Sequence, residues 1–214
     1  MPRLRQVPRS EAGPEVLNAY ERLFGDRDPV AEPGTATGTP GTWWTVMALV
    51  PEVLTSFQAS TRAISNLSAL TPYQKELGLL RAGFGKGSKF VYSQHCKAAR
   101  RAGVPDEKIE AVSAWASSDL FTPMERAVLA YADELVLADG RVQDATFARL
   151  QEHLSDEAIL ELTYAVTLYM AFAVFTRGLR LEYDDVDERL VEVPAPTADA
   201  AAADIGAIVS GSTH

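Results

Sequence analysis

Glu76 and His95 are the two residues of this sequence whose types and spacing best fit proton-transfer chemistry. Glu76 lies seven residues before Gly83 and His95 eight residues after Gly87, and the Gly-rich stretch between them predicts a short turn. Two helices joined by such a turn pack antiparallel, so residues at similar distances from the turn can meet. A carboxylate beside an imidazole orients the ring and stabilises its protonated form. The spacing leaves two interpretations open, an acid–base pair and a buried structural contact.

The single cysteine and the other two histidines give weaker signals. Cys96 directly follows His95, so on a helix its side chain points about 100° away from the ring. A lone helical cysteine is usually a small core residue. His153 lies near the end of an expected helix and His214 is the last residue, so no histidine pair has metal-ligand spacing. The sequence therefore predicts no metal site.

Three residues are expected to share the helix face of His95. Ser88, Val91 and Tyr92 precede it by seven, four and three residues, the intervals that place side chains on one face of a helix. We expect them to line a substrate pocket.

Four further residues are candidates for substrate binding. Trp43 and Trp44 follow a long loop and could form a lid or wall, or else a core or subunit contact. Arg81 could hold a substrate carboxylate or enolate, with a surface ion pair as the alternative. The hydroxyl of Tyr169 could reach the site, or could only satisfy one buried hydrogen bond.

Hydrophobic periodicity and capping signals predict an all-α chain. Thr71-Pro72 and Thr122-Pro123 each begin a helix and have Gln or Glu three residues after the Thr, which is a capping box. Because these starts are fifty-one residues apart, they also suggest an approximate internal repeat. Helical patterns cover residues 11–25, 43–64, 72–82, 88–102, 104–116, 124–136, 142–154 and 155–179.

The domain organisation follows from this pattern. Residues 1–192 are expected to form a single all-α domain, interrupted by a long Pro- and Gly-rich loop at 26–42 that could be a lid. Helix 72–82 is expected to break at the glycines that follow it. Residues 193–214 have small side chains and little apolar periodicity, which is typical of a flexible or loosely docked tail.

Composition limits the partners. The 214-residue chain has a formal net charge of −9, which argues against nucleic acid and anionic membranes. One cysteine fits a reducing compartment, and no apolar run of signal-peptide length follows the N-terminus, so we expect a cytoplasmic protein. The apolar stretch 164–175 is too short to span a bilayer and is expected to be a buried helix. The acidic run 182–189 is expected to form a solvated face or an edge contact.

Residues 71–112 resemble the carboxymuconolactone decarboxylase family, which also contains the alkylhydroperoxidase D proteins. Its pattern is a Glu, a turn, an aromatic helix start and a His followed by small and basic residues. The positions that fit are Glu76, Phe90, Tyr92, His95, Ala99 and Gly103. Residues 125–175 also resemble the longer members. The resemblance implies a helical bundle of the alkylhydroperoxidase D-like type, a functional Glu76–His95 pair and a homo-oligomer (dimer, trimer or hexamer).

The departures from the family pattern narrow the function. In the peroxidase branch two cysteines occupy the positions of Ser88 and Val91, so dithiol peroxide reduction is not expected here. Decarboxylase-like members often have Glu at the position of Val91. What remains is a cofactor-independent acid–base enzyme acting on a small carbonyl, lactone or enolisable acid, by decarboxylation, isomerisation or a related lyase or hydrolytic step.

Two alternatives stay open. One is a peroxidase-like activity through Cys96 alone, and the other is a non-catalytic ligand-binding or assembly protein on the same fold. Acid–base catalysis predicts that Glu76 and His95 are hydrogen-bonded at the wall of a cavity, whereas binding alone predicts that they are out of contact.

Overall fold

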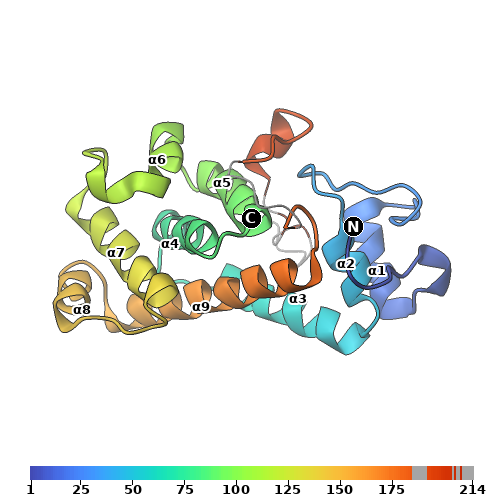
Figure 1. The fold of residues 1–214 in the computed structure, drawn as a ribbon, viewed down its shortest axis with the longest axis horizontal. Helices are drawn as coiled ribbons and strands as arrows, with labels where there is room; N and C mark the ends of the chain where they lie inside the picture. Colours follow the sequence, from blue (N-terminus) through green and yellow to red (C-terminus); the bar gives the residue numbers. More distant parts are fainter. Residues whose placement is uncertain (185–191, 204, 206–207, 209–214) are drawn as a thin grey trace.

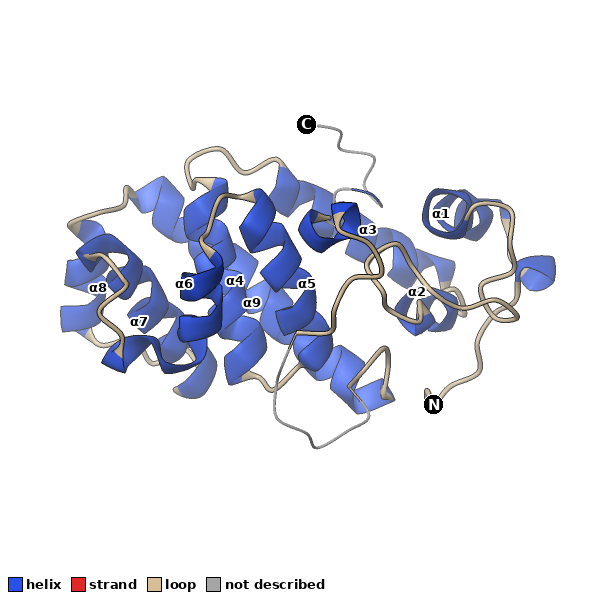
Figure 2. Ribbon diagram, turned by 90° about the horizontal axis from the view of Figure 1, so that it is seen from above, coloured by secondary structure: helices blue, strands red, loops and turns tan. Residues whose placement is uncertain are grey.

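The computed structural model describes residues 1–184, 192–203, 205 and 208, and this part of the chain consists of helices and loops without a β-strand (Figure 1, Figure 2). The predicted all-α class is therefore confirmed. The α-helices are α1 Pro14–Phe24, α2 Thr42–Met47, α3 Pro51–Ser65, α4 Pro72–Gly85, α5 Lys89–Arg101, α6 Asp106–Ala111, α7 Pro123–Leu137, α8 Asp144–Gln151 and α9 Asp156–Leu179. Short 3-10 helices are η1 Arg9–Glu11, η2 Val112–Ser117 and η3 Asp199–Ala202.

The long helix α9 connects the two halves of the molecule (Figure 1). Helices α4 and α7 pack on it at one end, and α5 packs on both α4 and α9. The other end of α9 meets α2 and α3 through aromatic side chains. The buried apolar side chains form two clusters, and α5 and α9 contribute to both. Residues on these two helices therefore lie where the clusters meet.

The predicted helix starts are confirmed in detail. The Thr71 hydroxyl accepts a hydrogen bond from the Gln74 backbone N–H, and the Gln74 side-chain oxygen accepts one from the Thr71 backbone N–H, which completes a capping box on α4. Thr122 and Glu125 form the same arrangement on α7. Both boxes satisfy backbone donors that would otherwise be unpaired at the helix ends. The internal repeat that these caps suggested stays a prediction.

The expected helix break at Gly83 is wrong, because α4 continues to Gly85. A Cβ atom at Gly83 would lie 2.7 Å from the backbone nitrogen of Tyr92 on α5, so glycine at this position permits a close approach of the two helices. The turn itself occurs at Gly87, whose φ of 67° lies in the left-handed region that favours glycine. The hairpin is thus longer and more tightly packed than the glycine pattern predicted.

The acidic segment that follows α9 is partly buried, contrary to the expected solvated face. Glu182 accepts hydrogen bonds from the backbone N–H groups of Gly41 and Trp43, at 3.0 and 2.6 Å. Asp184 accepts bonds from the Ser88 hydroxyl and the Phe90 N–H at the start of α5, at 2.6 and 3.2 Å. These carboxylates fix the ends of two helices, and residues 185–189 of the run lie outside the described residues.

Glu182 should make stability depend on pH. Burial raises the pKa of its carboxyl from the ordinary 4.5 to about 7. The folded chain therefore binds this proton more tightly than the unfolded chain, and stability falls as pH rises from about 4.5 to 7. We expect Glu182→Gln to remove up to about 3 kcal/mol of this loss. Urea unfolding of both proteins between pH 5 and 8 measures the difference, and parallel pH profiles would contradict the expectation.

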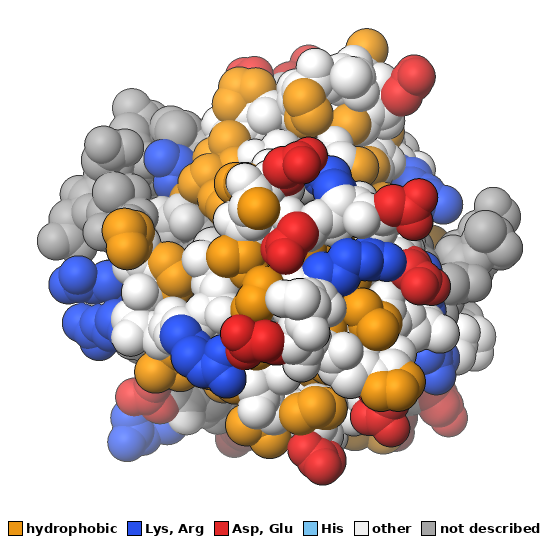
Figure 3. All heavy atoms as spheres, turned by 90° about the vertical axis from the view of Figure 1, so that its right-hand side faces the viewer, with side chains coloured by type: hydrophobic (Ala, Val, Ile, Leu, Met, Phe, Trp, Pro, Cys, Tyr) orange, Lys and Arg blue, Asp and Glu red, His pale blue; other side chains and the backbone are white. Residues whose placement is uncertain are grey.

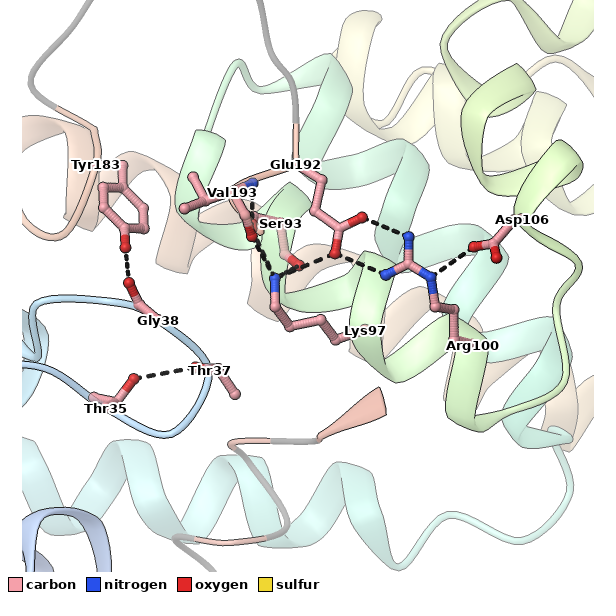
Figure 4. Close-up of polar contacts among 10 residues, drawn as sticks. All are labelled: Thr35, Thr37, Gly38, Ser93, Lys97, Arg100, Asp106, Tyr183, Glu192 and Val193. Atoms are coloured by element: carbon pink, nitrogen blue, oxygen red, sulfur yellow. Dashed lines mark hydrogen bonds and ion pairs between the residues drawn. The ribbon is translucent and has the colours of Figure 1, made fainter. Parts of the chain in front are cut away.

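Part of the C-terminal tail is docked on α5 (Figure 4). Lys97 is fully buried and its ammonium donates to the Val193 carbonyl at 2.9 Å. Arg100 contacts both carboxylate oxygens of Glu192, at 2.7 and 2.6 Å, and Ser93 accepts a bond from the Val193 N–H. Of the tail expected to be flexible, the residues outside the described part are 204, 206–207 and 209–214.

The prediction that the apolar segment is too short to span a bilayer considered residues 164–175 alone. It is wrong, because this segment is half of the 24-residue helix α9, which is long and apolar enough to cross a membrane by length and composition. The buried residues of α9, among them Leu162, Val166 and Phe172, belong to the two apolar clusters. A single helix of this length and composition also occurs in the cores of globular proteins.

On the face of the molecule shown in Figure 3, hydrophobic, basic and acidic side chains are interspersed.

We expect the protein to be a homo-oligomer. Leu160 and Val174 on α9 are 69% and 63% exposed, and Tyr164 is exposed beside Leu160. An apolar helix face left open in this way is typical of a subunit contact. Light scattering at micromolar concentration should give a mass above one chain, and Val174→Glu should lower it. A wild-type mass of one chain would contradict this expectation.

Candidate acid–base site

The α4–α5 hairpin brings Glu76 and His95 into contact, as the spacing predicted. The Nδ1 atom of His95 lies 2.7 Å from Oε2 of Glu76, and both residues are buried. The approach of α5 to α4 at Gly83 keeps the two helices close enough for this bond. The contact is confirmed, whereas its catalytic role stays a prediction.

The imidazole of His95 is held on two sides. An ionised carboxylate can only accept a hydrogen bond, so beside ionised Glu76 the Nδ1 atom carries the proton. The edge of the Tyr169 ring on α9 packs against the imidazole, with centroids 4.3 Å apart and planes at 87°. In the neutral ring this arrangement leaves a lone pair on Nε2, which has no hydrogen-bond partner within the described part of the chain. His95 can therefore accept a proton at Nε2.

A cavity of about 50 Å³ lies beside His95, with walls that are mainly aromatic. This volume exceeds what one water needs but is smaller than the roughly 150 Å³ of an engineered cavity that binds benzene. None of the described lining residues is Asp, Glu, Lys or Arg. The aromatic lining residues are Trp43, Trp44, Phe57, Phe90, Tyr169 and Phe172. The site is a small and largely apolar compartment with one basic nitrogen in its wall.

Trp43 is the centre of the aromatic wall. Its ring centroid lies 5.1 Å from that of Phe57 on α3, 6.0 Å from Phe90 on α5 and 5.5 Å from Phe172 on α9. The backbone N–H of Trp43 is bonded to Glu182. Since four helices meet at this ring, Trp43 is both a core residue and part of the cavity wall. None of the described lining residues belongs to the loop 26–42 that precedes it.

Glu76 faces a second, smaller cavity on its other side, of about 10 Å³, which His95 and Tyr169 also line. The Lys75 ammonium lies 3.8 Å from Oε1 of Glu76 at this cavity. The Glu76–His95 pair therefore separates a larger apolar cavity from a smaller one that contains a charged group. A proton accepted from the larger cavity would leave its charge next to a carboxylate.

Of the seven predicted substrate-binding residues, four line the larger cavity: Trp43, Trp44, Val91 and Tyr169. Ser88 does not, because its hydroxyl caps α5 by accepting the Val91 N–H and also donates to Asp184. Its position on the face of His95 is thus used for helix capping.

Arg81 and Tyr92 also lie away from the cavity. The guanidinium of Arg81 pairs with Asp133 on α7 and donates to the carbonyls of Val112 and Ser113, so it is unavailable to a substrate in the cavity. The ring of Tyr92 packs against Phe84 and belongs to a different apolar cluster from Trp43, Phe90 and Phe172 of the aromatic wall. Neither residue lines this cavity within the described part of the chain, so their predicted role in substrate binding stays a prediction that the geometry does not support.

The sequence did not point to three polar residues that line the cavity, Gln58 and Thr61 on α3 and Gln94 on α5. Gln94 directly precedes His95, so on the helix their side chains point about 100° apart. Both still line the cavity, because the cavity lies between these two directions. The helix-face rule counted only intervals of three, four and seven residues, so it excluded this neighbour. In the sequence alone Gln94 looks like a solvent-facing amide, so no sequence signal distinguished it.

Cys96 is separate from the site. Its side chain is 1% exposed, and its residue is not among those that line either cavity. Burial raises the pKa of the thiol to about 12. Since the thiolate is the reactive form of cysteine, this group is unreactive in the folded chain at neutral pH.

A thiol reagent measures this directly. We expect the folded protein at pH 7 to react with a disulfide reagent at least 100-fold more slowly than the urea-unfolded chain. Cys96→Ser should leave activity and stability nearly unchanged. Fast labelling of the folded protein, or a large loss of turnover in the variant, would contradict the assignment.

Within the described residues, no group of three or more His, Cys, Asp or Glu side chains is arranged to hold a metal ion. The charged groups near His95 are Glu76 and Lys75. The chemistry that this arrangement supports directly is proton transfer.

Comparison with known proteins agrees with this description. Residues 46–134 match the model of the carboxymuconolactone decarboxylase family. The uncharacterized protein YdfG of Bacillus subtilis (strain 168) is 27% identical over 100 residues, which is 46% of this chain and 68% of that protein. Over this region, which is less than half of the chain, the sequence is similar to the carboxymuconolactone decarboxylase family, and its helices form an alkylhydroperoxidase D-like fold.

Two solved structures support the fold. A protein of unknown function from Agrobacterium tumefaciens, described as a putative antioxidant defence protein AhpD, is 25% identical with a TM-score of 0.58, over 68% of this chain and 96% of that one. The debrominase Bmp8 is 17% identical with a TM-score of 0.65, over 82% of this chain and 89% of that one. The second likeness concerns the fold alone.

Proposed function

We propose that this protein is a cofactor-independent acid–base enzyme that transfers protons on a small carbonyl compound, lactone or enolisable acid. The observation that carries the proposal is the 2.7 Å bond between Glu76 and Nδ1 of His95, at the wall of a cavity that His95 faces. A protein that only binds a ligand has no need of this bond.

The proposed step uses the two nitrogens of His95 differently. Nε2 accepts a proton from the substrate, and Glu76 stabilises the positive charge that then develops on the ring through Nδ1. Tyr169 limits rotation of the ring. If the proton on Nε2 is replaced from solvent before it returns to the same carbon, the result is exchange, and return to another carbon gives isomerisation.

Peroxide reduction is less well supported. The two positions that bear cysteines in the peroxidase branch are Ser88, which caps a helix, and Val91, which lines the cavity. The remaining thiol, Cys96, is buried away from the cavity and its pKa is raised to about 12. A single-cysteine mechanism would need movement of α5 to expose this group.

Deuterium incorporation from D₂O tests the proposal. The probes are hydroxyacetone, γ-butyrolactone and pyruvate, followed by proton NMR with and without enzyme. We expect the protein to accelerate exchange of carbon-bound protons in at least one probe and His95→Ala to lose this acceleration. Equal exchange by wild type and His95→Ala in every probe would overturn the proposed function.

A further inference from the structure

We infer that the site takes a small uncharged carbonyl compound and binds its developing oxyanion through neutral N–H groups of Trp44, Gln58 and Gln94. This inference rests on the proposed function, since it assigns the substrate class of the same cavity. None of these three residues matches a position of the family pattern described above.

The cavity beside His95 is lined by residues with buried polar atoms that lack hydrogen-bond partners within the described part of the chain. Within the described part of the chain, Nε1 of Trp44, Nε2 of Gln58 and both amide atoms of Gln94 make no hydrogen bond. Trp44 and Gln94 are each 7% exposed, and all three residues line the cavity beside His95. A buried polar group without a partner costs about 1–3 kcal/mol. Three such residues around one cavity indicate a ligand that supplies the missing partners.

The kinds of atom define the ligand. Trp44 can only donate, and Nε2 of Gln58 and of Gln94 also donate. Three donors in one compartment call for an oxygen acceptor. Oε1 of Gln94 and Nε2 of His95 are acceptors in the wall, and of these only the imidazole nitrogen is basic enough to take a proton, so the ligand also carries a removable proton. A carbonyl group with an adjacent C–H bond provides both.

The charge of the cavity lining also restricts the substrate. The described residues of the lining include no Lys or Arg, and the guanidinium of Arg81 is bound to Asp133 away from the cavity. A substrate carboxylate would therefore be buried without a counter-charge and close to Glu76, at a cost of several kcal/mol. An uncharged substrate avoids this cost. The expectation that Arg81 holds a carboxylate is replaced by neutral donors.

The chemical step balances within the site. His95 Nε2 takes a proton from the carbon next to the carbonyl, the C–H electron pair forms the C=C bond of the enolate, and the carbonyl π pair moves to oxygen. The N–H donors bind that oxygen while it is negative. Return of the proton from the same imidazolium to that carbon restores the substrate. Where the neighbouring carbon carries a hydroxyl group, its proton moves to the enolate oxygen, and protonation of the former carbonyl carbon then gives the isomer. The step needs no oxidant, reductant or second reactant.

Size restricts the class further. A cavity of about 50 Å³ has room for a compound of few non-hydrogen atoms.

Leu substitutions of Gln58 or Gln94 keep the side-chain volume close to that of the amide and remove its N–H donors. Because electrostatic donors of this kind typically contribute 10²- to 10³-fold each to a rate, their loss should be measurable.

Hydroxyacetone and pyruvate form a matched pair for the test, since both carry a methyl ketone and only pyruvate carries a carboxylate. We expect the methyl protons of hydroxyacetone to exchange with D₂O at least tenfold faster than those of pyruvate at equal concentration. Gln94→Leu and Gln58→Leu should each lower the exchange of hydroxyacetone by about 100- to 1,000-fold. Gln151→Leu, an exposed glutamine on α8, is the matched control and should change nothing.

The outcomes separate this inference from the proposed function. If pyruvate exchanges as fast as hydroxyacetone, or if both cavity variants keep the wild-type rate while His95→Ala loses it, the substrate assignment is overturned and the acid–base function stands. If His95→Ala also keeps the rate, the function itself fails. Absence of exchange in hydroxyacetone and γ-butyrolactone together would overturn the assignment to uncharged carbonyl compounds.

Discussion

His95→Ala is expected to lower the rate of substrate proton exchange by roughly 10²- to 10⁴-fold, the range typical of losing a general acid–base group. The reason is that Nε2 of His95 has no hydrogen-bond partner among the described residues, and that His95 lines the cavity. The protein should remain folded, because the ring packs at the cavity rather than in the centre of either apolar cluster. Unfolding in urea checks this.

Glu76→Gln should also lower the rate, because a neutral amide cannot stabilise the imidazolium. Since the two residues act as one unit, the double variant should be little slower than His95→Ala alone. His153→Ala, at an exposed position after α8, is the matched control and should keep the wild-type rate. Losses that multiply independently in the double variant would show that the pair does not act together.

Gly83→Ala is expected to reduce the free energy of unfolding by about 3 kcal/mol or more, beyond the usual cost of overpacking. The added Cβ would lie 2.7 Å from the backbone nitrogen of Tyr92 and 2.9 Å from its Cα. Backbone atoms cannot rotate away as the end of a side chain can, so α4 and α5 would have to separate. That separation would also lengthen the bond between Glu76 and His95.

Gly178→Ala is the matched control for this substitution. Gly178 lies in α9 and has no atom within 4 Å of an added Cβ, so alanine should stabilise the protein by about 0.5–1 kcal/mol through its higher helix propensity. Urea unfolding of both variants gives the two values. Similar stabilities for Gly83→Ala and Gly178→Ala would show that the hairpin does not depend on the close approach at Gly83.

The sequence predicts the features of this fold that depend on local pattern. The two Thr-Pro capping boxes and the meeting of Glu76 with His95 follow from residue type and spacing within 25 positions. Residues whose partners are distant in the chain could not be placed in this way. Arg81 forms an ion pair with Asp133, fifty-two positions away, and the Ser88 hydroxyl donates to Asp184, ninety-six positions away.

Glycine and glutamine illustrate the same limit. A glycine in a sequence indicates either a turn or a close approach, and only the position of Tyr92 shows that Gly83 belongs to the second kind. Gln94 reads as a solvent-facing amide until α3 and α9 close the cavity over it. The general chemistry of the site is therefore predictable from its acid–base pair, whereas its selectivity depends on long-range packing.

The position of the proton on the His95 ring tests the central claim most directly. Nitrogen-15 NMR of labelled protein distinguishes a protonated ring nitrogen from one with a free lone pair, and the His95 signals are those lost in His95→Ala. At pH 8 we expect the proton on Nδ1, bonded to Glu76, and a free lone pair on Nε2. In Glu76→Gln this preference should weaken. A ring that carries its proton on Nε2 in the wild-type protein would contradict the account, because no basic nitrogen would then face the cavity.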